Sequence, residues 1–204
     1  MIIIKDDLRN SLFDSIMSER KCRKFLGPAQ MGAVLGYDPY LSREHIRHEI
    51  ENGYDVKDTY ATSYGHEHED IALYYYQKLF NVEIHKAQFV VDPANRKIGG
   101  ICDGLIGGDA GIEIKCHVGQ QPLMTLPRKH LVQLTAYMYL YGRTRWVLFS
   151  CCFNRDHSLK TYNIFEVKWS QVQKRWKDEW KPQLDAFVNS AKWLSDQSKF
   201  KGKN

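Results

Sequence analysis

Hydrophobic positions change their spacing several times along the chain, and each change predicts a new element of secondary structure. Apolar residues recur every three or four positions over residues 8–16 and again over 64–81, as they do on one face of a helix. A Gly-Pro pair at 27–28 ends the first pattern before a short apolar stretch. A further helix is predicted over 42–52, because Gly53 follows it where a helix C-terminus favours glycine.

From residue 82 the apolar runs become short and rich in β-branched residues. Segments 82–91, 98–106 and 111–116 are separated by clusters of turn-forming residues, which predicts three strands in an antiparallel meander. Helical spacing then returns over 128–141. The middle of the chain is therefore expected to hold a sheet followed by a helix.

The last third of the chain predicts two more strands and a long helix. The strands are expected over 145–153 and 160–167, and an amphipathic helix is expected from Ser170 onward with a kink at Pro182. Taken in order, the elements predict an α/β fold in which helices flank a mixed central β-sheet.

Length and composition predict one domain. No repeat or linker divides the 204 residues. We expect a single domain over 1–204, with an N-terminal helical part (1–62), a core (63–168), and a C-terminal helix with a basic tail (169–204). Hydrophobic residues make up 43% and charged residues 26%, which excludes an intrinsically disordered chain.

The cysteine count and the lack of long apolar runs predict an intracellular protein. Five is an odd number of cysteines, and no segment has the pattern of a secretion signal or a membrane span. We therefore expect free thiols, no membrane partner and no secretion.

Charge permits a polyanionic partner without identifying one. Lys and Arg total 29 and Asp and Glu total 24, a net charge of +5. The basic residues form four groups, which are Arg20, Lys21, Arg23 and Lys24; Arg128 and Lys129; Arg143 and Arg145; and Lys199, Lys201 and Lys203. Several groups on one surface would supply the phosphate contacts that dominate nucleic-acid binding.

Candidate chemistry concentrates on two neighbouring predicted strands. If the Gly-rich turn at 107–109 closes a hairpin, Asp103 and Glu113 lie close together across it. Because side chains alternate along a strand, Glu113 and Lys115 share one face while Ile114 points into the core. Two adjacent carboxylates repel each other unless a cation lies between them, and their hard oxygens favour Mg²⁺ or Mn²⁺. The alternative is a Glu-Lys pair on a solvated face, which contributes little to stability.

The order of these residues resembles the PD-(D/E)XK nuclease superfamily, and most closely its phage-lambda-type exonuclease or YqaJ-like viral recombinase branch. The matching pattern is a Glu on a helix, then Asp, then Glu-x-Lys, then Gln-x-x-x-Tyr on a later helix. The matching segments are 65–72, 102–104, 113–116 and 133–137, together with an N-terminal segment at 31–40. The resemblance implies a restriction-endonuclease-like core with a mixed central sheet.

The resemblance also implies a role for each matching residue. Asp103 and Glu113 would ligate the metal with their carboxylates, and Ile114 would do so with its backbone carbonyl. Lys115 would position or deprotonate the attacking water. Glu69, rather than Glu67, would complete the acidic site, directly or through a water molecule.

Two residues of the later helix and several basic residues would support the site. Gln133 and Tyr137 would steady the catalytic groups and the DNA backbone. The basic residues expected to bind DNA are Arg20, Arg23, Lys24, Arg128 and Lys129.

The chain departs from the family pattern in two ways. Cys102 replaces a proline that often precedes the Asp. More important for function, Ala29, Ile101 and Gln121 occupy the positions where the lambda-type branch grips a terminal 5′-phosphate with Arg and Ser side chains. Either dependence on a 5′-phosphate is weak, or the basic residues near position 20 replace this grip.

The function that the resemblance implies is a Mg²⁺-dependent exonuclease, with Mn²⁺ as a substitute, that digests duplex DNA ends 5′ to 3′ for recombination or DNA processing. The alternatives are a structure-specific or endonucleolytic enzyme of the same fold, or a catalytically idle DNA-binding module. As partners we expect duplex DNA ends, a single-strand annealing protein and two further copies of the chain in a homotrimer. The aromatic residues of the C-terminal helix are candidates for that subunit contact, or for the core. The cytoplasm of a bacterium or host cell, or the nucleus for a eukaryotic virus, is the expected location.

Overall fold

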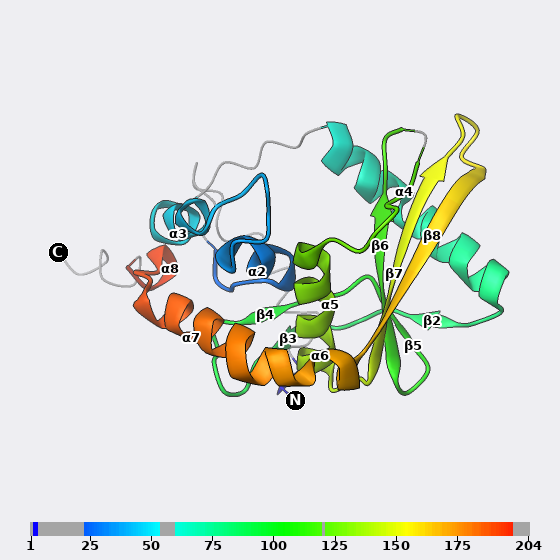
Figure 1. The fold of residues 1–204 in the computed structure, drawn as a ribbon. Helices are drawn as coiled ribbons and strands as arrows, with labels where there is room; N and C mark the ends of the chain where they lie inside the picture. The colour runs from blue at the N-terminus through cyan, green and yellow to red at the C-terminus, as the bar shows by residue number, and fades with distance from the viewer. Residues whose placement is uncertain (1, 4–22, 54–59, 120, 198–204) are drawn as a thin grey trace.

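The protein is described by a computed structural model that covers residues 2–3, 23–53, 60–119 and 121–197 (Figure 1). The helix expected over 8–16 and the basic residue Arg20 lie outside these residues. Within them, two β-sheets are covered by helices, which confirms the expected α/β class with a mixed central sheet.

The larger sheet has five strands in the order β2-β5-β6-β7-β8. Its strands are β2 (Ile84–His85), β5 (Gly104–Ile106), β6 (Ala110–Cys116), β7 (Arg145–Phe153) and β8 (Leu159–Lys168). Strands β6 and β7 are parallel and the other neighbouring strands are antiparallel, so the sheet is mixed.

A smaller sheet corrects two of the predicted strands. It contains β1 (Ile2–Ile3), β3 (Val90–Val91) and β4 (Gly99–Gly100) in the order β1-β3-β4. The segments 82–91 and 98–106 are therefore not continuous strands, since each contributes one short strand to each sheet. The hydroxyl of Tyr141 provides the physical reason, because it accepts from the N–H of Cys102 and donates to the carbonyl of Gln88 in the two connecting stretches.

Two long helices cover opposite faces of the larger sheet (Figure 1). Helix α4 (Tyr60–Phe80) packs against the face that carries Ile112, Val147 and Phe149. Helix α5 (Arg128–Tyr141) packs against the other face, which carries Trp146 and Leu148. The β6 side chains therefore alternate between an α4 side and an α5 side.

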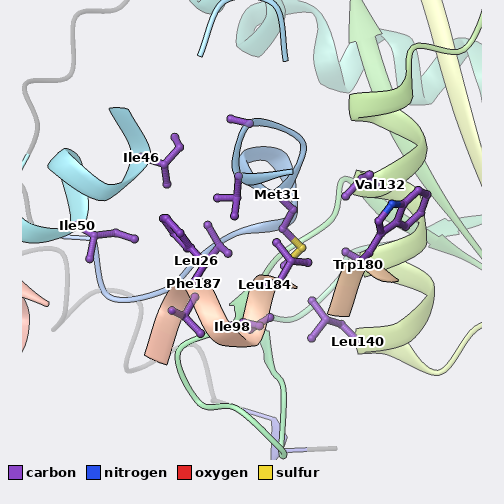
Figure 2. Close-up of a cluster of buried hydrophobic side chains, with 14 of the residues drawn as sticks. Leu26, Met31, Ile46, Ile50, Ile98, Val132, Leu140, Trp180, Leu184 and Phe187 are labelled. Atoms are coloured by element: carbon purple, nitrogen blue, oxygen red, sulfur yellow. The ribbon is translucent and has the colours of Figure 1, made fainter. Parts of the chain in front are cut away.

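Other helices form a second core beside α5 (Figure 2). They are α2 (Pro28–Val34), α3 (Arg43–Asn52), α6 (Trp169–Arg175), the π-helical turn η1 (Trp176–Trp180) and α7 (Lys181–Ser190). The short helix α8 (Leu194–Gln197) follows Trp193, the last residue of this core. Helix α2 lies so close to α5 that a Cβ atom at Gly32 would be 2.6 Å from the Cβ of Lys129. This packing holds the 31–40 segment against the start of α5.

The structure places the aromatic residues of the C-terminal helix in the core, which was one of the two expected alternatives, and it changes the form of the expected kink. Trp176, Trp180 and Phe187 are fully buried in the chain's own core, so they provide no exposed surface for a subunit contact. The irregularity expected at Pro182 is a π turn just before it, in which the N–H of Lys181 bonds to the carbonyl of Trp176. Pro182 has no N–H to donate, so the helix widens one turn earlier.

The four cysteines in the described part of the chain are free thiols, as expected. None of the described helices combines the length and apolar composition that crossing a membrane requires.

Candidate active site

A tight hairpin brings the two predicted metal ligands together. Strands β5 and β6 pair with Gly104 opposite Ile112, and the next pair in this register is Asp103 and Glu113. The Oδ2 atom of Asp103 accepts a hydrogen bond of 2.6 Å from the backbone N–H of Ile114. Glycine is required at position 104, since a Cβ there would lie 2.3 Å from the Cγ2 of Ile84. The sequence prediction of two adjacent carboxylates is confirmed by this geometry.

Glu113 and Lys115 share the α5 side of β6, whereas Ile114 points into the core on the α4 side. Glu113 is only 3% exposed, and its Oε1 lies 2.5 Å from the Nζ of Lys115. A pair on a solvated surface is thereby excluded. A buried carboxylate is costly unless it is paired or serves a function, and here one oxygen is paired.

Gln133 makes the second contact with the Oε1 atom of Glu113. The Nε2 of Gln133 donates to Glu113 Oε1 over 2.7 Å, whereas Glu113 Oε2 is buried and has no hydrogen-bond partner among the described residues. Both contacts with the carboxylate therefore involve Oε1, and Oε2 is available to bind a cation.

Tyr137 lies one helical turn after Gln133 and fixes the strand that leads into Asp103. Its hydroxyl, which is buried, donates to the backbone carbonyl of Ile101 over 2.9 Å. Tyr137 therefore holds the backbone of Ile101, close to Asp103, and its hydroxyl is directed into the protein interior.

Three carboxylates and one ammonium lie partly buried in the site and shift one another's pKa values. Burial, followed by the charges of Glu113 and Glu69, raises the pKa of Asp103 to about 8. Burial and the charge of Glu113 also raise the pKa of Glu69. Burial alone would lower the pKa of Lys115, but the carboxylates of Glu113, Asp103 and Glu69 outweigh it and raise that pKa. An acid whose ionisation is suppressed by neighbouring carboxylates favours a bound cation.

Glu69 comes from α4 and is the third acid of the site. It is partly exposed, and Glu67, two residues earlier, is exposed to solvent. The electrostatic coupling of Glu69 with Asp103 and Glu113 supports its assignment over Glu67.

The donor set suits a hard divalent cation. The potential ligands on the β5–β6 hairpin are the Asp103 carboxylate and the unpaired Glu113 Oε2, both oxygen donors. Among the described residues, no three His, Cys, Asp or Glu side chains converge closely enough to hold an ion by themselves. An ion at this site would therefore need further oxygen donors such as water, and Mg²⁺ commonly keeps several water ligands.

Three of the basic residues expected to bind DNA make contacts within the described part of the chain. Arg128 and Lys129 lie in the first turn of α5, where Arg128 packs over the ring of Tyr37 and Lys129 pairs with Asp38 at 3.2 Å. Arg23 pairs with Glu49 at 2.7 Å.

Two other basic residues lie away from the site. Arg145 pairs with Asp109, and Arg143 donates to the carbonyl of Gly107. These contacts place both arginines at the turn of the hairpin, at the end opposite to Asp103 and Glu113.

His130 and Tyr141 were not predicted as site residues, although they lie on the same side of α5 as Gln133 and Tyr137. His130 Nδ1 lies 3.2 Å from Gln133 Oε1, and Tyr141 binds the backbone beside Cys102. Positions 130, 133, 137 and 141 recur every three or four residues, so extending the Gln-x-x-x-Tyr pattern by one turn in each direction would have found both.

Comparison with protein families decides where the chain belongs. The model of the YqaJ-like viral recombinase domain matches residues 20–144, which is more than half of the chain. The chain belongs to the YqaJ-like viral recombinase domain family. The matched range includes every residue of the acidic site in this recombinase domain, from Glu69 to Tyr137. A search of curated proteins finds no match.

Solved structures share the fold of this YqaJ-like domain. The alkaline exonuclease LHK-Exo from Laribacter hongkongensis is similar with a TM-score of 0.63 and 16% identity, over 87% of this chain and 91% of that one. A phage-related exonuclease from Haemophilus somnus 129PT is similar with a TM-score of 0.54 and 15% identity, over 85% of this chain and 97% of that one. The expected nuclease-like core, a mixed sheet flanked by helices, is confirmed by these likenesses.

Proposed function

We propose that this YqaJ-like domain is a Mg²⁺-dependent DNA exonuclease that hydrolyses phosphodiester bonds at duplex ends in the 5′ to 3′ direction. The observation that carries the proposal is the buried carboxylate of Glu113. Lys115 and Gln133 hold its Oε1, and its unpaired Oε2 lies in the same site as Asp103. A surface that only binds DNA gains nothing from carboxylates near the phosphates, because like charges repel. The fold shared with exonucleases supports the proposal, as does the LHK-Exo structure solved in complex with dAMP.

Asp103, Glu113 and the carbonyl of Ile114 would hold Mg²⁺, with Glu69 contributing directly or through water and Mn²⁺ serving as a substitute. When bound, the ion would act as a Lewis acid on the phosphate and lower the pKa of water.

The chain's own residues supply positioning and charge. The N–H of Ile114 orients Asp103, and Gln133 orients Glu113. Lys115 is partly exposed and adjacent to the carboxylates, so its ammonium can turn toward a phosphate and stabilise the negative charge that develops there. Without metal, the charges of the neighbouring carboxylates outweigh burial and raise the pKa of Lys115, so its side chain is an ammonium in that state.

The DNA duplex would contact the basic residues near the site. Arg128 and Lys129 begin the helix that carries Gln133, so we propose that they contact the DNA backbone beside the acidic pair. Three basic residues precede α2 in the chain, namely Arg20, Arg23 and Lys24. We propose that they contact the DNA backbone beside the phosphates bound by Arg128 and Lys129.

Digestion of linear and of closed-circular duplex DNA tests the function. We expect degradation of the linear DNA in Mg²⁺, no reaction in EDTA, and an intact circle. Nicking of the circle would show the endonucleolytic alternative, and binding without cleavage in Mg²⁺ or Mn²⁺ would show an idle DNA-binding module. Labels at the 5′ and 3′ ends of the linear DNA give the polarity.

Assembly and partnership are further parts of the proposal. A homotrimer around the DNA and a single-strand annealing protein remain proposed on family resemblance, since the C-terminal aromatic residues are buried in the described chain. Light scattering at micromolar concentrations should give three times the chain mass of 23.9 kDa. A monomer throughout would remove the trimer.

A further inference from the structure

A histidine outside the acidic site is connected to it by two hydrogen bonds. His130 Nδ1 lies 3.2 Å from Gln133 Oε1, and Gln133 Nε2 donates to Glu113 Oε1 over 2.7 Å. Gln133 is 3% exposed and His130 is half-buried, so water competes little for these contacts. The chain His130, Gln133, Glu113 therefore runs from the first turn of α5 to the proposed metal ligand.

The direction of these bonds depends on the orientation of the Gln133 amide. A side-chain amide has a donating end and an accepting end, and turning it over would place its oxygen against the Glu113 carboxylate. A donor on the far side prevents this rotation. His130 is such a donor when Nδ1 carries the proton of the neutral ring. Burial, followed by the charge of Lys115, lowers the pKa of His130 to about 4, so the ring is neutral at pH 7.

The consequence falls on Glu113. Lys115 and Gln133 both bind Oε1, and Oε2 is left buried and unpaired. If Gln133 turned over, one of the two contacts that fix the carboxylate would become repulsive, and Oε2 would lose its fixed direction.

We infer that His130 is a positioning residue, which holds the Gln133 amide so that Glu113 keeps Oε2 available for the cation. The inference rests on the proposed function, because it assigns to Glu113 the role of a metal ligand. It adds a residue outside the Asp, Glu-x-Lys and Gln-x-x-x-Tyr pattern. His130 itself is not expected to touch DNA or metal.

Three substitutions of His130 separate positioning from packing. His130→Phe keeps a ring but removes the donor, and His130→Leu removes the donor with a smaller side chain. In His130→Asn the side-chain amide nitrogen can replace Nδ1 as donor. His85→Phe, on an exposed histidine of β2, is the matched control. Circular dichroism and thermal melting report folding of each variant.

The first readout is Mn²⁺ binding without DNA, measured by electron paramagnetic resonance. His130→Phe and His130→Leu should weaken Mn²⁺ binding by about tenfold, as loss of a group that orients a metal ligand commonly does. His130→Asn and His85→Phe should bind Mn²⁺ within about twofold of the natural chain. Unchanged binding in a folded donor-free variant, or equal loss in His130→Asn, would overturn the inference.

The second readout is a double-mutant cycle with Gln133→Ala. If His130 acts through Gln133, His130→Phe should lower kcat in the natural background, leave KM for DNA unchanged, and have no further effect in the Gln133→Ala background. Additive losses would show that His130 acts independently and would overturn the inference. If the natural chain shows no Mg²⁺-dependent cleavage but His130→Phe still weakens Mn²⁺ binding, the proposed function fails and the positioning role survives.

Discussion

Asp103 and Ile114 are joined by a hydrogen bond of 2.6 Å, in which the Asp103 carboxylate accepts from the backbone N–H of Ile114. This hydrogen bond connects the residue before β5 to β6, and it fixes the Asp103 carboxylate beside Glu113. The residue proposed to offer its carbonyl to the metal thus also fixes the direction of the first ligand. Asp103 therefore has a structural contact and a proposed chemical role in one side chain.

The first prediction concerns the pH dependence of stability without metal. The pKa of Asp103 is raised from 3.8 to about 8, so between these values the folded state holds a proton that the unfolded chain has lost. Stability should fall as pH rises from about 4 to about 8, by at most about 1.4 kcal/mol per pH unit from this group. Urea denaturation in EDTA should show a shallower fall for Asp103→Asn. The control Asp109→Asn, at the exposed hairpin turn, should keep the natural slope. Equal slopes for Asp103→Asn and the natural chain would contradict the prediction.

The second prediction concerns Lys115. Lys115→Met should lower kcat by on the order of 10²-fold, with KM for DNA nearly unchanged, because the ammonium acts on charge that develops in the transition state. Steady-state kinetics on linear duplex DNA measure both constants. Lys86→Met, on an exposed lysine, is the control and should retain full activity. A raised KM with an unchanged kcat would mean that Lys115 only anchors phosphate.

The third prediction concerns the DNA end. Ala29 and Gln121 are exposed and uncharged, and the backbone carbonyl of Ile101 already accepts from Tyr137. None of these groups can give a phosphate the bidentate, charge-assisted contact that arginine gives. Cleavage rates on 5′-phosphorylated and 5′-hydroxyl duplexes should therefore be nearly equal. A tenfold preference for the phosphate, about 1.4 kcal/mol of discrimination, would instead indicate that basic residues before α2 grip the end.

The fourth prediction concerns the second core. Asp92 is fully buried and its Oδ2 lies 3.0 Å from the ammonium of Lys181, which is 13% exposed. Asp92→Ala leaves that ammonium without its most buried partner and removes the acceptor for Tyr139, so it should cost about 3 kcal/mol of unfolding free energy. The exposed pair of Lys174 and Asp178 is the control, because Asp178→Ala should leave the urea midpoint unchanged. Equal effects of the two substitutions would reject the prediction.

The sequence predicted the acidic hairpin well because its signals are local. Residues 103 and 113 lie on either side of a Gly-rich turn, and strand alternation then determines which side chains share a face. The Gln-x-x-x-Tyr pattern places both side chains on one side of α5 for the same reason. Family resemblance supplied the roles, and the structure supplied the distances.

The sequence could not predict the division of strands between two sheets. An apolar, β-branched run shows that a segment favours extended structure, but the hydroxyl of Tyr141, some 40 to 50 positions away, interrupts both runs. The buried tryptophans of the C-terminal helices were ambiguous for a related reason. Helical spacing shows that Trp176 and Trp180 share a face, but whether α5 or another subunit covers that face depends on tertiary packing.

The most direct test of the proposed exonuclease activity is the release of nucleotides from linear duplex DNA in Mg²⁺ by the natural chain, Asp103→Asn and the control Asp109→Asn. Asp103→Asn keeps the size of the side chain but removes a proposed ligand charge, whereas Asp109 is on the same hairpin at its exposed turn. We predict rapid release by the natural chain and Asp109→Asn, and a loss of at least about 10³-fold in Asp103→Asn, several kcal/mol of transition-state stabilisation. Nucleotide release by a folded Asp103→Asn variant at the natural rate would rule out Asp103 as a catalytic metal ligand.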